Sequence, residues 1–340
     1  MKKTLLITTL LALVACSSSD LVDKNANKDV QVVQQVVEPV ATVCDDRLCF
    51  IQKHNQIPAS EWNYFFSRVQ FKENIINVIN KPSTSRPYYQ FAKDNIGKKR
   101  INDGITFYKQ NQSVIEKIEA QYGVPGEVLT AILGIETHYG RNTGSFRVAD
   151  SLDTLAFAYP KRAEFFQNEL AEFMLMSKEL GSDPMSFSGS YAGAMGMPQF
   201  MPSSYRKWAK DGDGDGFADI WTNRADALAS VANYLVEHGW KRNGKISIRL
   251  NEPQSAILDG ISAEKTALTR TVADFRNMGI SIPQDIADDE PAILYRLEIA
   301  PDQFAYYLGL NNFYTVWQYN NSRLYVHSVS KIAAGIRSGK

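Results

Sequence analysis

Residues 126–139 read Gly-Glu-Val-Leu-Thr-Ala-Ile-Leu-Gly-Ile-Glu-Thr-His-Tyr, and this stretch has the apolar spacing of a helix. With about 100° between residues, Glu136 falls in the middle of the apolar arc. The opposite arc holds the polar residues Glu127, Thr130, Thr137 and His138. A carboxylate placed among apolar side chains is expected to have a raised pKa, and a carboxylic acid that stays protonated near neutral pH is a competent general acid. A core glutamate paired with a buried Arg or Lys would fit the same pattern.

The rest of the folded part is predicted to be mainly helical. Gly181 is expected to end one of the helices as a C-cap glycine. Alternation typical of strands is concentrated between Lys245 and Ile299, in Ile246–Leu250 and in Ile293–Glu298. We therefore expect a mainly α (α+β) fold with a small β-containing insertion. Helical spacing is found in five further stretches: Trp62–Ile79, Ile101–Tyr122, Arg162–Leu180, Ala225–His238 and Ser322–Ile336.

The first residues are predicted to form a targeting signal. Lys2 and Lys3 precede a short apolar run, and the following Leu13-Val-Ala-Cys16 resembles a bacterial lipobox. The resemblance implies cleavage before Cys16, lipidation of that cysteine and, because Ser17 follows it, sorting to the outer membrane. An ordinary secretory signal with a chance cysteine is the alternative. Residues 16–59 are predicted to be a lipid-anchored flexible tether, with a short strand at Val30–Val37 as the alternative for that part.

Charge and cysteine content exclude several classes of protein. The 340 residues include 37 basic and 37 acidic side chains, which argues against an electrostatic nucleic-acid binder. The three cysteines, Cys16, Cys44 and Cys49, are too few for a disulfide scaffold or a cysteine-rich zinc module. In an oxidising periplasm Cys44 and Cys49 are expected to form a small disulfide loop; two free thiols are the alternative.

A second stretch rich in glycine and small residues extends from Gly189 to Ser204. Its glycines and alanines allow the backbone to approach a ligand closely. Backbone amides together with Ser190 and Gln199 suit the hydroxyl and acetamido groups of a sugar. A tightly packed loop without a ligand would have the same composition.

Several motifs together resemble the lytic transglycosylases, and most closely the membrane-bound lytic murein transglycosylase B family. Three of them carry most of the resemblance: Gly134-Ile-Glu-Thr-His-Tyr-Gly140, Gly189-Ser-Tyr-Ala-Gly-Ala-Met-Gly196 and Gln199-Phe-Met-Pro-Ser-Ser204. Tyr159–Phe166, Ser230–Tyr234 and Asn312–Tyr325 agree as well. The resemblance covers roughly residues 87–336 and implies a lysozyme-like helical core with the cleft between helices.

The resemblance implies cleavage of the β-1,4 bond between N-acetylmuramic acid and N-acetylglucosamine in peptidoglycan, with formation of 1,6-anhydromuramic acid ends. Glu136 matches the family's single general acid/base. Phe91 stands where the family usually has a tyrosine, and Lys161 replaces an arginine, which keeps the charge but loses bidentate geometry. Residues matching the substrate-binding positions are Ser190, Gln199, Tyr234, Tyr319, Asn320, Tyr325 and the basic pair Lys161 and Arg162.

An aspartate-rich segment, residues 211–226, resembles an EF-hand loop. Position 12 of a standard loop should be Glu but is Thr222. The family resemblance includes a longer loop closed by an aspartate, and Asp226 fits that role. A solvated acidic turn is the alternative, but we expect a structural calcium, with no cofactor needed for catalysis. The predicted ligands are Asp211, Asp213, Asp215, the carbonyl of Phe217, Asp219 and Asp226.

The sequence thus predicts a lipid-anchored enzyme, a carbon–oxygen lyase on the periplasmic side of the outer membrane. Glycan strands and outer-membrane lipid are its expected partners, cell-wall synthesis complexes are candidate protein partners, and nucleic acid is excluded. A hydrolytic muramidase and a non-catalytic peptidoglycan-binding lipoprotein are the rival functions. The expected boundaries are 1–15 signal peptide, 16–59 tether and 60–340 transglycosylase domain, the last divided into a helical lobe (60–115 and 305–340), a catalytic core (116–242) and the β insertion (243–304).

Overall fold

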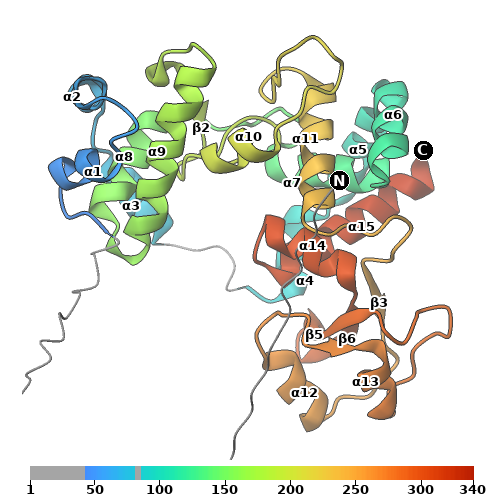
Figure 1. The fold of residues 1–340 in the computed structure, drawn as a ribbon. Coiled ribbons are helices and arrows are strands. Elements are labelled where there is room, and N and C mark those ends of the chain that lie inside the picture. Colours follow the sequence, from blue (N-terminus) through green and yellow to red (C-terminus); the bar gives the residue numbers. More distant parts are fainter. Residues whose placement is uncertain (1–42, 81–85) are drawn as a thin grey trace, which may run out of the picture. The chain divides into compact units, whose positions relative to one another are not determined.

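The computed structural model describes residues 43–80 and 86–340, which fold mainly into helices (Figure 1). Helices up to residue 137 are α1 (Arg47–Lys53), α2 (Ala59–Arg68), α3 (Glu73–Ile79), α4 (Tyr88–Asn95), α5 (Lys98–Gln110), α6 (Gln112–Tyr122) and α7 (Gly126–Thr137). Later helices are α8 (Val148–Ala158), α9 (Ala163–Glu179), α10 (Pro202–Trp208), α11 (Arg224–Glu237), α12 (Ala256–Ala263), α13 (Val272–Asn277), α14 (Asn311–Tyr319) and α15 (Arg323–Gly339). None of the helices in residues 43–80 and 86–340 combines the length and the apolar character of a transmembrane span. The predicted signal peptide, Cys16 and the alternative strand at Val30–Val37 lie outside the described residues.

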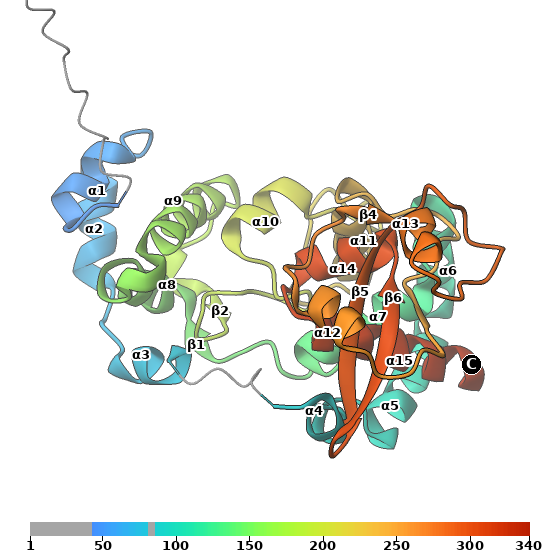
Figure 2. The ribbon, with the colours of Figure 1, turned by 90° about the horizontal axis from the view of Figure 1, so that it is seen from below.

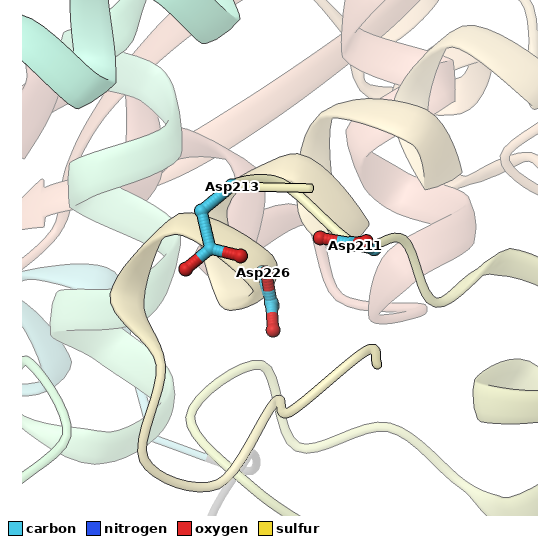
Figure 3. A group of neighbouring side chains, drawn as sticks. All are labelled: Asp211, Asp213 and Asp226. Atoms are coloured by element: carbon cyan, nitrogen blue, oxygen red, sulfur yellow. The ribbon is translucent and has the colours of Figure 1, made fainter. Parts of the chain in front are cut away.

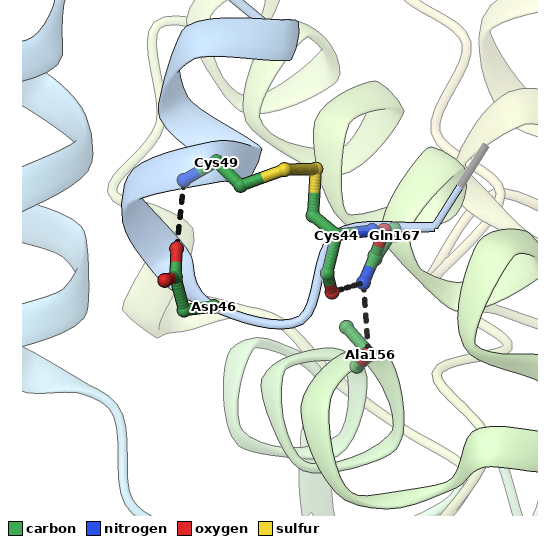
Figure 4. Close-up of a disulfide and its surroundings, with 5 residues drawn as sticks. All are labelled: Cys44, Asp46, Cys49, Ala156 and Gln167. Atoms are coloured by element: carbon green, nitrogen blue, oxygen red, sulfur yellow. Dashed lines mark hydrogen bonds between the residues drawn. A yellow bond between two sulfur atoms is a disulfide. The ribbon is translucent and has the colours of Figure 1, made fainter. Parts of the chain in front are cut away.

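The predicted tether ends too late in the sequence. Helix α1 begins at Arg47, and its Phe50 is fully buried in the main core. Cys44 and Cys49 form a disulfide with a Cα–Cα distance of 5.5 Å (Figure 4). The backbone N–H and carbonyl of Cys44 both bond to the side-chain amide of Gln167 on α9, at 3.0 and 2.7 Å. The prediction of a flexible segment up to residue 59 is therefore wrong, because residues 44–58 already belong to the folded domain.

Two predicted helices are each split in the structure. Between α2 and α3, the backbone N–H of Gln70 donates to Asp150 and that of Lys72 to Thr154, so side chains of α8 hold this linker. Asn111 separates α5 from α6 by donating from its side chain to the carbonyl of Phe107 at 2.7 Å. The apolar spacing continued across both breaks, but polar contacts set the helix ends.

A four-stranded antiparallel sheet separates two cores. Its order is β3-β6-β5-β4, from β3 (Ser247–Arg249), β4 (Arg270–Thr271), β5 (Pro291–Ala300) and β6 (Gln303–Gly309), and a separate two-stranded sheet joins β1 (Phe146–Arg147) to β2 (Ser188–Gly189). Helices α12 and α13 lie on one side of the four-stranded sheet, and α14 and α15 lie on the other (Figure 1). Residues of β5 alternate between the cores: Tyr295 packs into the main core and Leu294 into the smaller one.

Strand β6 extends the sheet beyond the predicted end of the insertion at residue 304. Figure 2 shows β5 and β6 side by side, and their register pairs Ile293 with Gly309 and Tyr295 with Tyr307. Both faces of β6 are buried, so its sequence lacks the apolar–polar alternation by which a half-exposed strand is recognised. The mainly α fold with a small sheet is confirmed, but the boundary at 304 is wrong.

Candidate active site

Helix α7 carries Glu136 near its C-terminal end and is buried on nearly all sides. Glu127, Thr130 and Thr137, which the helical wheel placed on a polar face, are all buried. The hydroxyl of Thr137 donates to the carbonyls of Leu133 at 3.2 Å and Met197 at 3.0 Å. The prediction of a one-sided apolar helix is therefore wrong, because internal partners satisfy the polar groups of the other arc.

The carboxyl group of Glu136 lies beside Tyr325, whose hydroxyl donates to Glu136 Oε1 at 2.6 Å. No ion pair among the described residues includes Glu136, and Tyr325 is its hydrogen-bond partner there. Burial raises the pKa of Glu136 to about 7, while the bond from Tyr325 acts in the opposite direction. Glu136 as a whole is half-buried, and with a pKa of about 7 its carboxyl group is protonated in a large fraction of molecules at neutral pH.

Three tyrosines from two distant parts of the chain meet next to Glu136. The rings of Tyr319 and Tyr325 lie 6.4 Å apart and nearly parallel, and Tyr234 of α11 packs edge-on against Tyr319 at 4.9 Å. Burial, and next the charge of Glu136, raise the pKa values of Tyr319 and Tyr325 well above the usual value. Both hydroxyls therefore remain protonated donors; that of Tyr319 donates to the carbonyl of Pro198 at 2.5 Å.

The glycine-rich segment folds against the turn that follows α7. A Cβ atom on Gly144 would lie only 2.1 Å from the carbonyl oxygen of Gly189, so the two backbones approach as closely as glycine permits. Ser190 Oγ accepts from the N–H groups of Ala192 and Ala194, at 3.3 and 3.0 Å. Gln199 Nε2 donates to the carbonyls of Thr143 and Gly196. Both predicted sugar-binding side chains thus help to shape the loop.

A cavity of about 630 Å³ brings together some of the predicted substrate-binding residues. Arg162, Tyr319 and Asn320 line it, whereas Lys161 is exposed and outside its lining. The guanidinium of Arg162 lies 4.1 Å above the ring of Phe165. Both members of the basic pair are exposed, but only Arg162 lines this cavity.

Arg100 of α5 was not among the predicted functional residues. Its Nη1 donates to the carbonyl of Gly134 at 2.8 Å and approaches that of Ile135 at 3.5 Å, so it binds the C-terminal end of the helix that carries Glu136. No local signal could have revealed this contact, because the partners are 34 and 35 residues apart in sequence.

The aspartate loop gathers three of the six predicted metal ligands. Carboxylate oxygens of Asp211, Asp213 and Asp226 lie within 4.8 Å of one another (Figure 3). Asp226 is buried, and its oxygens accept from the N–H groups of Gly212 and Asp219, both at 2.7 Å. Burial, with help from the nearby aspartates, raises the pKa of Asp226. Close carboxylates that repel one another fit a divalent cation with oxygen ligands, such as calcium.

The carboxylates of Asp215 and Asp219 lie outside this group. Asp215 accepts from the N–H of Phe217 at 2.9 Å, and Asp219 accepts from the N–H groups of Trp221 and Thr222. These carboxylates are thus held by their own turns.

The chain resembles known proteins over most of its length. A family model described as Transglycosylase SLT domain matches residues 46–334. Membrane-bound lytic murein transglycosylase B of Escherichia coli (strain K12) is 34% identical over 249 residues, which are 73% of this chain and 67% of that protein. The structure of soluble lytic transglycosylase SltB1 from Pseudomonas aeruginosa has a TM-score of 0.78 and 35% identity, covering 86% of this chain and 97% of that one.

Two further solved structures carry ligands. Escherichia coli lytic transglycosylase Slt35 in complex with calcium has a TM-score of 0.74 and 30% identity, over 85% of this chain and 90% of that one. Pseudomonas aeruginosa SltB3 in complex with NAG-NAM-pentapeptide has a TM-score of 0.75 and 28% identity, over 86% and 79%. The family resemblance of the motifs is thereby confirmed. The chain belongs to the Transglycosylase SLT domain family, that of the lytic murein transglycosylases.

Proposed function

We propose that this lytic transglycosylase uses Glu136 as its single general acid/base to cut the β-1,4 bond between N-acetylmuramic acid and N-acetylglucosamine. The observation that carries the proposal is a carboxyl group on a half-buried residue, with a pKa of about 7 and a tyrosine, not a cation, as its partner. A group with this pKa can give up a proton and take one back at neutral pH. Family membership and the glycan–peptide complex of SltB3 support peptidoglycan as the substrate.

The proposed reaction begins with proton transfer from Glu136 to the glycosidic oxygen. That bond breaks, the N-acetylglucosamine end leaves as an alcohol, and the acetamido oxygen of the muramyl sugar bonds to the anomeric carbon. The Glu136 carboxylate then removes the proton of the muramyl 6-hydroxyl, whose oxygen attacks the anomeric carbon and displaces the acetamido oxygen. The product is a 1,6-anhydro end, and Glu136 is protonated again.

The tyrosines hold Glu136 ready for both steps. Because Tyr325 donates to Oε1, Oε2 is the atom proposed to exchange the proton with substrate. Tyr319 packs against the ring of Tyr325, and Tyr234 packs against Tyr319, so together they fix the position of the Tyr325 ring. The remaining sugar contacts are proposed for Ser190, Gln199 and Asn320, with Lys161 and Arg162 facing the carboxylates of the peptide stem or lactyl group.

The loop at residues 211–226 is proposed to hold a structural calcium through Asp211, Asp213 and Asp226. The clustering of their carboxylates and the calcium complex of Slt35 support this assignment. Calcium is expected to raise the melting temperature of the protein by several degrees, as for any ligand that binds only the folded state. Asp226→Asn should remove most of that increase in a thermal melt, and an equal increase in both proteins would contradict the assignment.

Anchoring through lipidated Cys16 is proposed for the N-terminus. The lipobox-like Leu13–Cys16 and the membrane-bound character of the E. coli relative support it. Residues 17–43 would then link the lipid to the domain that begins near Cys44, leaving the enzyme free to reach glycan from the outer membrane. Cell-wall synthesis complexes remain candidate partners.

Mass spectrometry of digested murein sacculi tests the reaction. Muropeptides with 1,6-anhydro ends are expected from the wild-type protein. Reducing ends would identify a hydrolytic muramidase, and intact sacculi would identify a binding protein; either result would overturn the proposal.

A further inference from the structure

A second cavity lies beside the C-terminal end of α7, close in sequence to Glu136. It has a volume of about 420 Å³ and is lined from α4, from α5 and from the turn after α7. His138 and Tyr139, two and three residues beyond Glu136, belong to its wall. None of its charged residues has a role in the proposed reaction.

Positive charge dominates this cavity. The cations Lys93, Lys99, Arg100 and Arg141 face one carboxylate, that of Asp103. Asp103 already pairs with both Lys99, at 2.9 Å, and Arg141. Neither Lys93 nor Arg100 forms an ion pair with another described residue. In a chain with equal numbers of basic and acidic side chains, this local excess is a distinct feature.

Neutral groups hold the half-buried guanidinium of Arg100. Besides the carbonyls of Gly134 and Ile135, its Nη2 lies 3.4 Å from His138 Nε2. The pKa of His138 is lowered, first by burial and then by the charges of Arg100 and Arg141, so the imidazole remains neutral at neutral pH. The cavity therefore has a positive potential that Asp103, the one carboxylate among its described lining residues, does not neutralise.

The cavity adjoins the proposed glycan site through one short turn. Asn142 lines the cavity, and its N–H donates to the carbonyl of Thr137 at 2.9 Å. The next residue, Thr143, accepts the 3.1 Å bond from Gln199, which is proposed to contact sugar. A strand bound along Glu136 and Gln199 would therefore have the cavity within reach of its substituents.

We propose that this cavity binds carboxylate groups of the peptide stem carried by a muramyl residue of the bound glycan. The inference rests on the proposed function, since it assumes that the glycan lies along Glu136. Carboxylates are the anions that a peptide stem presents, and arginine and lysine side chains bind them through charge-assisted hydrogen bonds. The cavity is separate from the one lined by Arg162, so the two sites would recognise stems at two positions along a strand.

The test compares two substrates with variants that remove charge but leave Arg100 in place. Lys93→Gln combined with Arg141→Gln should lower the ratio of kcat/KM on stem-bearing glycan to kcat/KM on amidase-stripped glycan about tenfold, mainly through KM. Lys117→Gln, an exposed cation of α6 outside the cavity, is the matched control and should leave the ratio unchanged. Amidation of the stem carboxylates should abolish the wild-type preference.

The outcomes separate the two proposals. An unchanged ratio in the double variant, or an equal loss on both substrates, would overturn the stem site while leaving the reaction intact. Retention of the preference on amidated stems would likewise overturn the stem site, because the cations would then not be binding carboxylates. Failure of the wild-type protein to form anhydro ends from either substrate would instead refute the proposed function.

Discussion

The two glutamates of α7 are surrounded by protein but differ in their partners. Glu127, in the first turn, pairs with Lys340 at 2.5 Å and Arg337 at 3.4 Å. Glu136, in the last turn, has the hydroxyl of Tyr325 instead. Burial alone would raise the pKa of Glu127, but the bonds from Lys340 and from its own N–H, together with both positive charges, lower it. Burial raises the pKa of Glu136 to about 7, and one tyrosine does not reverse this.

Burial therefore does not by itself make a carboxyl group a catalytic acid. A cationic partner stabilises the carboxylate form and makes it a structural group, whereas a neutral donor leaves the proton in place. The two ends of one helix thus carry an ion pair that holds α15 against α7 and the carboxyl group that is proposed to be the acid.

The largest expected effect is on activity. Glu136→Gln should lower kcat on glycan strands by about a thousandfold, because it removes the group that both gives and takes the proton. Glu127→Gln is the matched control on the same helix and should retain most of the activity when assayed where it is folded. Similar losses in the two variants would mean that helix integrity, not the acid, limits the reaction.

The pH dependence of kcat/KM should follow Glu136. As the pH rises above about 7, the protonated form is depleted and kcat/KM should fall about tenfold per pH unit. A steady-state profile between about pH 5 and pH 9 checks this. The descending limb should be the same in Glu127→Gln, and a limb near pH 4 to 5 would be incompatible with the proposed acid.

Replacing the two glutamates of α7 by glutamine should change the free energy of unfolding in opposite directions. Glu127→Gln should lower the free energy of unfolding by about 1 to 3 kcal/mol at neutral pH, because it leaves Lys340 and Arg337 without their carboxylate. The folded-state pKa of Glu127 is lowered, so its contribution is present above the unfolded value of about 4.5 and is lost as the pH falls through the folded value.

For Glu136 the pH dependence of the contribution to stability is reversed. Its raised pKa means that the carboxyl group favours the folded state below about pH 4.5 and loses this contribution as the pH rises through about 7. Glu136→Gln should therefore gain stability relative to the wild type over that interval. Denaturant titrations of both variants at several pH values measure the difference. Parallel pH profiles of their unfolding free energies would contradict the opposite pKa shifts of the two glutamates.

The smallest effect is expected for Tyr325→Phe. Loss of the hydrogen bond to Oε1 should raise the pKa of Glu136 further and shift the descending limb of the pH profile to higher pH, with about a tenfold loss of kcat. Tyr314→Phe is a suitable control, since that ring stacks on Trp317. A lower rate without any shift of the limb would mean that Tyr325 acts only on substrate.

The sequence supported the family, the helical fold and the position of Glu136, because motifs and local spacing carry that information. It did not reveal the ion pair of Glu127, whose partners lie 210 and 213 residues away at the end of α15. For the same reason the helical wheel, which placed Thr137 on the polar arc, did not show that this residue is buried: its hydroxyl bonds to the carbonyl of Met197, 60 residues away.

The predicted domain boundaries were wrong where tertiary contacts determine them. Residues 44–58 look like the end of a polar tether, yet Cys44 bonds to Gln167 and Arg47 pairs with Asp153 at 2.8 Å. In the aspartate loop the sequence offered six ligands, and the fold brings the carboxylates of Asp211, Asp213 and Asp226 together, which the linear spacing did not reveal.

The most direct test of the comparison is an NMR titration of the side-chain carboxyl carbons, with Glu136→Gln and Glu127→Gln used for assignment. The account predicts a midpoint near pH 7 for Glu136 and one below the ordinary value of about 4.5 for Glu127. Midpoints near 4.5 for both residues would contradict it, because Glu136 would then be ionised at neutral pH and could not supply the proton.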